Sequence, residues 1–548
     1  MKNTLPAIIF FLLLQSCSVS TSENQTAHIT IGDTVINESF GGVGFHVFYH
    51  IHQAPKWHYE QVFAKRWREL NPSFARITDY PHWDKEKINE VSQYLEVMKD
   101  TDTELYFTTW GTDAINNYTD ANEYVIKQVA NLDYWKQVKG FSNLNYYCMT
   151  NELSIEEWAS IIKRNELERF KEIHTLFYDL LSQKGIEIKL LASDASPISN
   201  WNTIEWAANN MDDITGVYGG HHYINDYDLF DNSFYPFFLE KMKWGSTLAK
   251  EKNKKFIIGE FGPKQNSNTI DSVRHDACIY NNTPLEKFTG IQIGEAILAM
   301  INGGIYSGNY WTFSDFPSTY RSTYINKWGV FKWEIDDFSP RPSYFALGLL
   351  TKYFRGPAKV FEVSSTDSLI RVAAIQNLED NSYSIAVINR TGIEKQLQIQ
   401  MDWLDRIIEL RKYVYDPEHV PFNYFGDLQS YSEKVALKNG EFSDEVPPLS
   451  LVVYTSKFDE IPPEKVKNLK IELEQRDRMR HVLTWDPNTE ADFCYYRIYR
   501  SENEQVKTIP EKEIATTITA EYVDLRDHGL PPYYYKVVAV DNSGNSSE

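Results

Sequence analysis

Two apolar stretches, each ending in a glutamate, decide the fold of this chain: Tyr146-Tyr-Cys-Met-Thr-Asn-Glu152 and Phe256-Ile-Ile-Gly-Glu260. Both are short and rich in β-branched or aromatic residues, which favours β-strands. Each is therefore expected to form a buried strand with its glutamate at the carboxyl end.

Similar β-rich runs recur between about residue 42 and residue 315, and helical stretches separate them. The eight candidate strands are Val43–Phe48, Phe74–Thr78, Glu104–Trp110, Leu144–Thr150, Ile188–Asp194, Gly216–Tyr223, Lys255–Phe261 and Ile305–Phe313. Their starts lie roughly 25 to 50 residues apart, which is the spacing of βα units rather than of hairpins. Amphipathic stretches such as Ile161–Gln183 and Pro284–Met300 lie between them. Eight such repeats predict an α/β fold, and they favour a closed (β/α)8 TIM barrel over residues 28–355 rather than a doubly wound sheet.

The pattern changes from about residue 356. Leu369–Gln376 and Tyr383–Asn389 alternate like β-strands, and Ser450–Thr455 follows a Pro-Pro pair. These runs predict a β-sandwich over residues 356–457. The strand His28–Ile36 precedes the barrel and is a candidate to join that sandwich.

A second β-rich region follows the linker at Pro462-Pro463. It covers residues 464–548 and includes Trp485-Asp-Pro487 and the run Tyr534–Asn545. Nearly the whole segment resembles a fibronectin type III domain. The resemblance implies a further β-sandwich with Trp485 and alternating Tyr and Val side chains in its core, acting as a spacer or a weak binder.

The first 16 residues are similar to a bacterial lipoprotein signal peptide. Lys2 gives a positive start, Ile8 to Leu14 is an apolar run too short to span a bilayer, and Cys17 follows Leu-Gln-Ser. The pattern predicts cleavage before Cys17, lipidation of that residue and a tether over residues 17–27. We then expect a protein anchored by lipid in the outer or cell membrane of a bacterial envelope, periplasmic or at the cell surface. An ordinary secretory signal cut nearby is the alternative.

Composition excludes several classes of protein. Hydrophobic residues make up 42% and charged residues 24% of the 548 residues, near the globular average, which excludes a disordered or fibrous chain. Asp and Glu outnumber Lys and Arg by 76 to 55, and a formal charge of −21 disfavours nucleic acid as a partner. Cys148, Cys278 and Cys494 are too scattered for a disulfide framework or a zinc site, and Cys148 and Cys494 are expected in the core.

The two glutamates carry the chemistry. Glu152 and Glu260 lie 108 residues apart, yet both end a strand of the same predicted barrel, where active sites gather. One such glutamate alone is more often a helix cap or a surface residue. Two at one end match what glycoside hydrolysis needs, an acid that protonates the leaving oxygen and a carboxylate that attacks the anomeric carbon.

With these motifs the chain resembles the retaining glycoside hydrolases of clan A. In that clan an Asn-Glu pair ends strand four and a glutamate ends strand seven. The resemblance implies that Glu152 is the acid/base, Glu260 the nucleophile and Asn151 a partner of the sugar 2-hydroxyl. It also places Arg76, at the end of strand two, beside Glu260. A retaining pair of carboxyl groups is expected about 5–5.5 Å apart.

The same resemblance assigns further residues at the barrel mouth. His221 and Tyr223 share one face of strand six, and Tyr223 is implied to donate to the nucleophile, whereas His222 faces a helix. Trp311 on strand eight is implied to be the floor of the subsite where the bond breaks. A second sugar platform is expected at Trp110.

Three polar residues complete the candidates. His46 and His50 on strand one are expected to bind hydroxyls, and Asp194 is expected either to do the same or to cap the next helix. The adjacent His221 and His222 also suggest a metal, but no third ligand stands at a sensible spacing, so we predict no metal and no cofactor.

Two classes of function remain. The layout is nearest to family 39, with Gly41-Gly-Val-Gly44 and Pro447-Pro-Leu-Ser450 as the reasons, and families 5, 30 and 51 also fit. The resemblance implies a retaining β-glycoside hydrolase that cleaves an extracellular poly- or oligosaccharide. The alternative is a catalytically inactive, glycan-binding surface lipoprotein, which would have no need of both acids.

Overall fold

The structure is a computed structural model that describes residues 26–47, 53–109, 120–155, 161–224, 231–263, 281, 283–317, 325–475, 479–526 and 533–547. The predicted signal peptide, the lipidation site Cys17, the start of the tether, His50, Trp110 and Cys278 lie outside these residues. Among the described residues, no helix combines the length and the apolar character needed to cross a membrane.

Eight parallel strands close into a barrel, as the sequence predicts. They are β2 (Gly42–Val47), β3 (Phe74–Thr78), β4 (Glu104–Thr108), β5 (Leu144–Cys148), β6 (Lys189–Ala195), β7 (Val217–Ile224), β8 (Lys255–Pro263) and β9 (Ser307–Tyr310). Each strand pairs with the next in chain order, and β9 pairs with β2 to close the ring. Cys148 on β5 is buried, as expected for a core residue.

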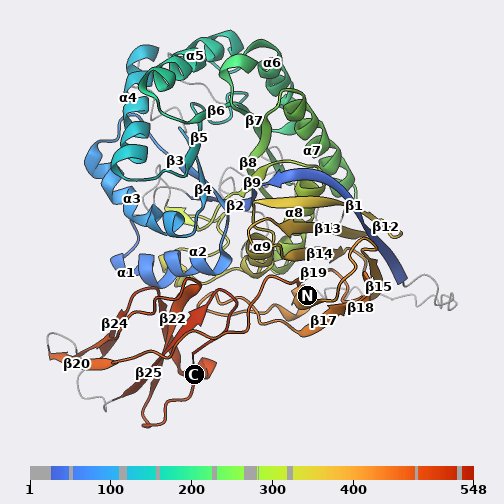
Figure 1. Ribbon diagram of the computed structural model, residues 1–548. Helices are drawn as coiled ribbons and strands as arrows, with labels where there is room; N and C mark the ends of the chain where they lie inside the picture. The colour runs from blue at the N-terminus through green and yellow to red at the C-terminus, as the bar shows by residue number, and fades with distance from the viewer. Residues whose placement is uncertain are drawn as a thin grey trace, which may run out of the picture.

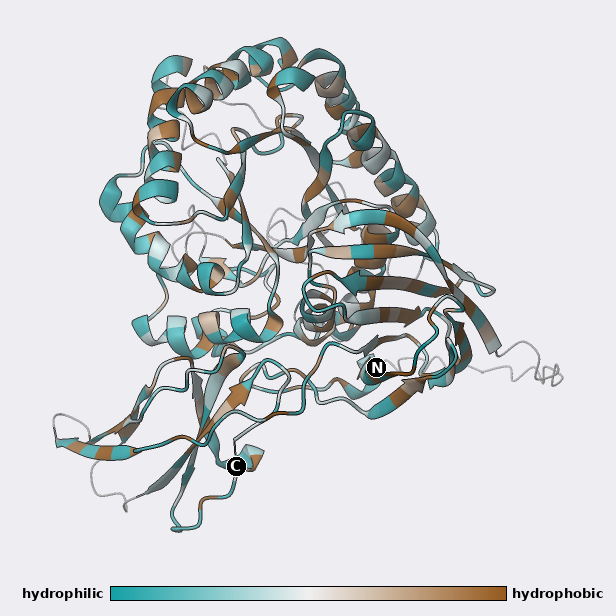
Figure 2. Cartoon of the chain, in the orientation of Figure 1, coloured by the Kyte–Doolittle hydropathy of each residue, from teal (hydrophilic) through white to brown (hydrophobic). Residues whose placement is uncertain are grey.

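Helices surround the barrel (Figure 1). They are α1 (Lys56–His58), α2 (Ala64–Leu70), α3 (Lys85–Asp100), α4 (Ala121–Asp133), α5 (Leu167–Lys184), α6 (Asn202–Asn210), α7 (Phe234–Glu251), α8 (Thr289–Asn302) and α9 (Pro342–Tyr353). The predicted helices at Ile161 and Pro284 begin later than expected, at Leu167 and Thr289. In Figure 2 the strands carry more apolar residues than the outward faces of these helices.

A nine-stranded sheet packs beside the barrel. Its strands are β1 (Thr26–Phe40), β12 (Ala358–Ser365), β13 (Ile370–Asn377), β14 (Tyr383–Asn389), β15 (Lys395–Gln400), β16 (Ile408–Tyr415), β17 (Glu433–Leu437), β18 (Glu441–Val446) and β19 (Ser450–Thr455). β1 pairs antiparallel with β12 and parallel with β15, so the N-terminal strand is part of this sheet. A two-stranded piece, β10 (Phe316–Pro317) and β11 (Ile325–Asn326), follows the last barrel strand.

The nine-stranded sheet curls over on itself. Its order is β17-β16-β19-β14-β13-β12-β1-β15-β18, so five strands separate β19 from β18. Nevertheless Phe442 of β18 and Tyr454 of β19 have ring centroids 5.1 Å apart. The two ends of the sheet therefore face each other across one apolar core.

The C-terminal region consists of two three-stranded sheets, β20-β21-β24 and β23-β22-β25. Their strands are β20 (Lys470–Gln475), β21 (Met479–Thr484), β22 (Phe493–Ser501), β23 (Glu513–Thr517), β24 (Glu521–Arg526) and β25 (Tyr534–Asp541). Trp485, Tyr496 and Val537 lie in its core, as predicted, and Cys494 is buried too.

This region contacts the barrel and the nine-stranded sheet region through its side chains, and its role as a spacer or a weak binder stays a prediction. The Thr516 hydroxyl donates to the carbonyl of Gln61, 3.1 Å away, in the π-helical turn before α2. Arg497 Nε donates to Asp427 at 2.9 Å, and Lys65 of α2 pairs with the same carboxylate. The C-terminal sheets are therefore fixed to the barrel through ion pairs with little solvent access.

Candidate active site

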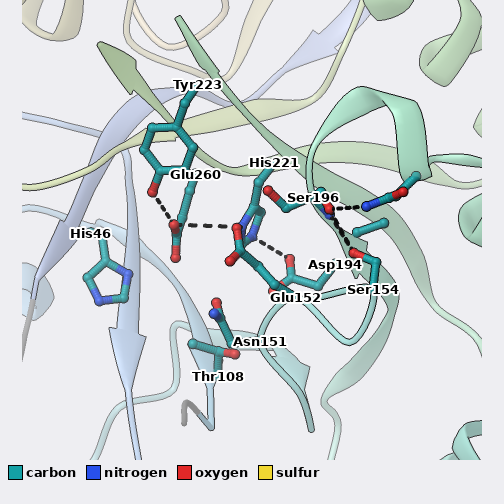
Figure 3. A network of polar contacts seen from close by, with 12 residues as sticks. His46, Thr108, Asn151, Glu152, Ser154, Asp194, Ser196, His221, Tyr223 and Glu260 are labelled. Carbon is teal, nitrogen blue, oxygen red and sulfur yellow. Dashed lines mark hydrogen bonds and ion pairs between the residues drawn. The ribbon is translucent and has the colours of Figure 1, made fainter. Parts of the chain in front are cut away.

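The carboxyl ends of five barrel strands bring seven polar residues together. They are Arg76 of β3, Asn151 and Glu152 after β5, Asp194 of β6, His221 and Tyr223 of β7, and Glu260 of β8. All but Tyr223, which is partly covered, are buried. Figure 3 shows most of this cluster, with His221 between Glu152, Asp194 and Glu260.

Glu152 and Glu260 face each other. One carboxylate oxygen of each, together with a ring nitrogen of His221, lie within 4.8 Å of one another. The two side chains are 12% and 5% exposed, so both carboxyl groups sit in a largely water-excluded pocket. This proximity fits the separation of about 5–5.5 Å of a retaining pair better than the roughly 6.5–9.5 Å of an inverting pair.

Arg76 holds one side of Glu260. Its Nη1 atom donates to Glu260 Oε1, and its Nη2 atom donates to Asn151 Oδ1 at 2.7 Å and to Asp194 Oδ2 at 2.9 Å. Burial lowers the pKa of Arg76, but the charges of Asp194 and Glu260 outweigh burial and raise this pKa well above its usual value. The Arg76 cation is therefore fixed between the carboxylates of Glu260 and Asp194.

Tyr223 holds the other oxygen of Glu260. Its hydroxyl donates to Glu260 Oε2. Burial and the charges of Glu260 and Glu152 raise the pKa of Tyr223 well above its usual value, so it remains a phenol and a donor. Both oxygens of Glu260 thus accept a hydrogen bond, which is the pattern that an ionised carboxylate adopts.

His221 joins three carboxylates. Its Nε2 atom lies 2.9 Å from Asp194 Oδ1, and its Nδ1 atom lies 3.0 Å from Glu152 Oε1 and 3.6 Å from Glu260 Oε2. Burial alone lowers the pKa of His221, but Asp194, Glu260 and Glu152 raise it to about 10. The ring is therefore an imidazolium at neutral pH, and both nitrogens donate.

A metal does not suit this cluster. Glu152, His221 and Glu260 are close enough to surround a cation. However, the Nδ1 atom of His221 already contacts Glu152, and both oxygens of Glu260 already accept hydrogen bonds from Arg76 and Tyr223. The geometry favours proton transfer over metal binding.

His46 and Trp311 form an aromatic layer at the site, with ring centroids 4.4 Å apart. His46 is 1% exposed. Its Nδ1 atom lies 3.3 Å from Arg76 Nη1 and its Nε2 atom 3.2 Å from Thr78 Oγ1. Burial, Arg76 and His221 lower the pKa of His46, so the neutral ring accepts from Arg76. His46 therefore supports Arg76, and binding of sugar hydroxyls by His46 stays a prediction.

Trp311 lies in a small aromatic cluster with Phe316 and Trp328, and Tyr223 packs against this cluster. Trp311 is thus next to Tyr223, which donates to Glu260. His222 points the other way and stacks on Phe238 of α7, with ring centroids 5.7 Å apart, as the alternation on strand β7 predicts.

Sequence reasoning missed the place of Asp194. It caps no helix, because the two helices that follow β6 have Pro197 and Trp201 at their N-caps. Instead it is fully buried against Arg76 and His221. The signal was present: Asp194 ends β6 at the same barrel end as the two glutamates.

The sequence matches no model of a protein family and no curated protein. Solved structures are similar in fold. A family 30 endoxylanase from Clostridium papyrosolvens is 14% identical, with a TM-score of 0.56 over 78% of this chain and 99% of that one. An α-L-arabinofuranosidase from Thermotoga maritima is 13% identical, with a TM-score of 0.57 and the same coverage.

A bacterial orthologue of human α-L-iduronidase is 13% identical, with a TM-score of 0.59 over 96% of this chain and 99% of that one. Only about 4% of this chain falls outside that alignment, so it includes the C-terminal sheets. At such identities these likenesses show the fold alone: the chain shares its architecture with structures of glycoside hydrolases.

Proposed function

We propose that this protein is a retaining β-glycoside hydrolase that cleaves a poly- or oligosaccharide outside the cytoplasm. The observation that carries the proposal is the pair of facing carboxyl groups at the barrel mouth, with Glu260 fixed by Arg76 and Tyr223 and Glu152 left to exchange protons. The solved structures of similar fold include a xylanase, an arabinofuranosidase and an iduronidase orthologue, which supports a carbohydrate substrate.

The reaction proceeds in two displacements. Glu260 attacks the anomeric carbon while Glu152 gives its proton to the leaving oxygen, so the glycosidic bond breaks and an ester to Glu260 forms. Water then attacks the same carbon, Glu152 takes its proton, and the ester bond breaks. Arg76 holds Asn151 by its Oδ1 atom, which orients the amide nitrogen toward the sugar 2-hydroxyl.

The site residues divide into those that react and those that position. Glu152 and Glu260 react, and Arg76 and Tyr223 hold Glu260 aligned. The indole of Trp311 forms the apolar floor against the C–H face of the sugar. Trp110 and His50 remain sequence-based candidates for further substrate contacts.

Stereochemistry tests this function directly. Purified residues 18–548 are assayed on a panel of aryl β-glycosides and polysaccharides, and the anomeric form of the first product is followed by proton NMR. The wild type is expected to release a sugar with retention, and Glu260→Ala to lose several orders of magnitude in rate. Azide should partly rescue Glu260→Ala and yield the inverted glycosyl azide.

The control is Glu205→Ala, which removes an exposed glutamate of α6 and should keep wild-type rates. Azide rescue of Glu152→Ala to the inverted azide, and of Glu260→Ala to the retained β-azide, would exchange the two roles. If the protein binds glycans but hydrolyses no substrate of the panel, the glycan-binding function replaces hydrolysis as the proposal.

We also propose that the chain belongs near family 39 and ends in a fibronectin type III domain. Two features support this: the strand from the N-terminus in the nine-stranded sheet, and two facing three-stranded sheets around Trp485. The lipid anchor on Cys17 rests on the sequence of residues 1–17. Metabolic labelling with a fatty acid, abolished by Cys17→Ala, is the expected result.

A further inference from the structure

Asp194 is the third carboxylate of the site, and the proposed reaction gives it no part. It is fully buried at the end of β6. Its φ angle of 58° lies in the left-handed region that few non-glycine residues adopt, so the surrounding fold imposes its position. A buried charge held in this way needs an explanation.

We propose that Asp194 is a positioning residue, which sets the orientation of His221 so that this ring donates to the acid/base Glu152. The inference rests on the proposed hydrolase function and adds a part to it. Asp194 touches neither the substrate nor the reacting atoms in this scheme. It acts through His221.

The two oxygens of Asp194 have separate partners. Oδ2 accepts from Arg76 Nη2 at 2.9 Å. Oδ1 accepts from the Tyr106 hydroxyl at 3.0 Å and from His221 Nε2 at 2.9 Å. Because Nε2 is taken by Asp194, the opposite nitrogen of the ring is turned toward the glutamates.

The ring favours one of the two glutamates. His221 Nδ1 is 3.0 Å from Glu152 Oε1 but 3.6 Å from Glu260 Oε2, and only the first contact is a hydrogen bond. Glu260 already has Arg76 and Tyr223 as donors. The connection from Asp194 therefore leads to the acid/base.

The backbone of β8 leaves room for this connection. A Cβ atom on Gly259 would lie 2.7 Å from His221 Nε2 and 2.8 Å from Asp194 Oδ1. Such distances are far inside van der Waals contact, so a side chain at this position would separate the pair. Glycine immediately before Glu260 thus permits the Asp194–His221 hydrogen bond.

The arrangement has a direct chemical consequence. His221 donates to Oε1 of Glu152 while Glu152 holds the transferable proton. In the first displacement this proton goes to the leaving oxygen, and the new carboxylate is stabilised by the His221 N–H. In the second displacement Glu152 takes a proton from water, and His221 keeps its own protons throughout.

The charged groups that face His221 are Asp194, Glu152 and Glu260, from three different strands or strand ends, and Arg76 pairs with Asp194. His46 is neutral. Asp194→Asn removes the one carboxylate that binds Nε2, and leaves the two reacting glutamates in place.

Leaving-group dependence tests the proposal. Aryl glycosides of the sugar that the wild type cleaves are compared between a good leaving group, 2,4-dinitrophenol, and a poor one, phenol. The good leaving group needs no protonation. Asp194→Asn is therefore expected to lose about 100-fold in kcat/KM on the phenyl glycoside, as for loss of general acid catalysis, and much less on the dinitrophenyl glycoside.

Two controls bracket this result. Glu152→Gln should show the same selectivity more strongly. Asp79→Asn changes another fully buried carboxylate at a strand end, whose side chain accepts from Gln128 and Trp135, and should leave the ratio between the two substrates unchanged. An equal loss of Asp194→Asn on both substrates would mean that Asp194 acts through Arg76 and Glu260, or only supports the fold, and would overturn the proposal.

A second measurement needs no turnover. Nitrogen NMR of protein labelled at histidine, with His221 assigned from His221→Asn, reports the protons on each ring nitrogen. We expect both nitrogens protonated in the wild type at pH of about 8, and a loss of ring charge in Asp194→Asn. A charged, unchanged His221 in Asp194→Asn would refute the positioning role, whereas a wild type inactive on every glycoside would refute only the hydrolase function.

Discussion

Arg76 is the residue whose replacement tests the electrostatics of the site most sharply. It is fully buried, and it makes ion pairs with both Glu260 and Asp194. Arg76→Met removes the charge but keeps much of the side-chain volume. Arg76→Lys keeps the charge but has one ammonium group in place of the planar fork, which reaches Glu260, Asp194, Asn151, His46 and Thr108.

The contacts give the magnitudes. Removing one partner of a buried ion pair costs about 3–5 kcal/mol, because a charge is left without compensation. Arg76→Met leaves the buried carboxylates of Glu260 and Asp194 without their cation. We therefore expect it to lower the free energy of unfolding by at least about 4 kcal/mol. Arg76→Lys loses the 2.7 Å bond to Asn151 or the 2.9 Å bond to Asp194, and a hydrogen bond to a charged group contributes about 1.5–3 kcal/mol.

Thermal unfolding and steady-state kinetics measure both effects. At about 2 °C per kcal/mol for a large domain, Arg76→Met should lower the unfolding midpoint by about 8 °C and Arg76→Lys by about 4 °C. Both variants should lose about 100-fold or more in kcat/KM, because the nucleophile loses its alignment. Arg76→Met with a wild-type midpoint, or Arg76→Lys with wild-type turnover, would refute this account of the site.

Three further predictions concern the C-terminal sheets, Gly259 and His221. Deleting residues 459–548 removes the Arg497 donor from Asp427, so it should cost at least about 2 kcal/mol and lower the unfolding midpoint of the remaining chain. Gly259→Ala should separate Asp194 from the imidazole of His221 and lower turnover about 10-fold or more. This loss is measured by comparing turnover of the phenyl and dinitrophenyl glycosides. The pKa of His221 is raised from 6.5 to about 10 on folding, so its stabilising charge is fully present below pH 6.5 and lost as the pH rises toward 10; the difference in midpoint between wild type and His221→Asn should shrink over that range.

The sequence predicts the barrel well because its signals are local. Each apolar run between Val43 and Phe313 corresponds to a barrel strand, and the alternation of His221, His222 and Tyr223 gives the correct faces. Helix starts are less accurate. Ile161 and Ile162 are buried and fit the period of α5, yet Asn165 has a φ of 60° and the helix begins only at Leu167.

Contacts between distant segments could not be predicted. Asp194 and His221 lie 27 residues apart in the sequence, and Arg76 and Asp194 lie 118 residues apart. No local sequence pattern therefore predicts that these residues are in contact. The same holds for the ion pairs of Lys65 and Arg497 with Asp427, which join the C-terminal sheets to the barrel. A linker at Pro462-Pro463 suggests independence, and only the fold shows the attachment.

The place of β1 determines the order in which the protein is able to fold. This first strand lies inside the nine-stranded sheet, and its neighbours are β12 and β15, which are more than 300 residues later in the chain. During synthesis the barrel can close as soon as β9 has emerged, whereas β1 has no partner until β12 ends at residue 365 and keeps one open edge until β15 ends at residue 400.

Its apolar residues Ala27, Ile29 and Ile31 stay uncovered for the same period. The strand at the beginning of the chain is therefore among the last to be secured. A circular permutant in which residues 26–41 follow β19 would shorten the time for which β1 has unpaired edges. It should refold faster and form the same final sheet.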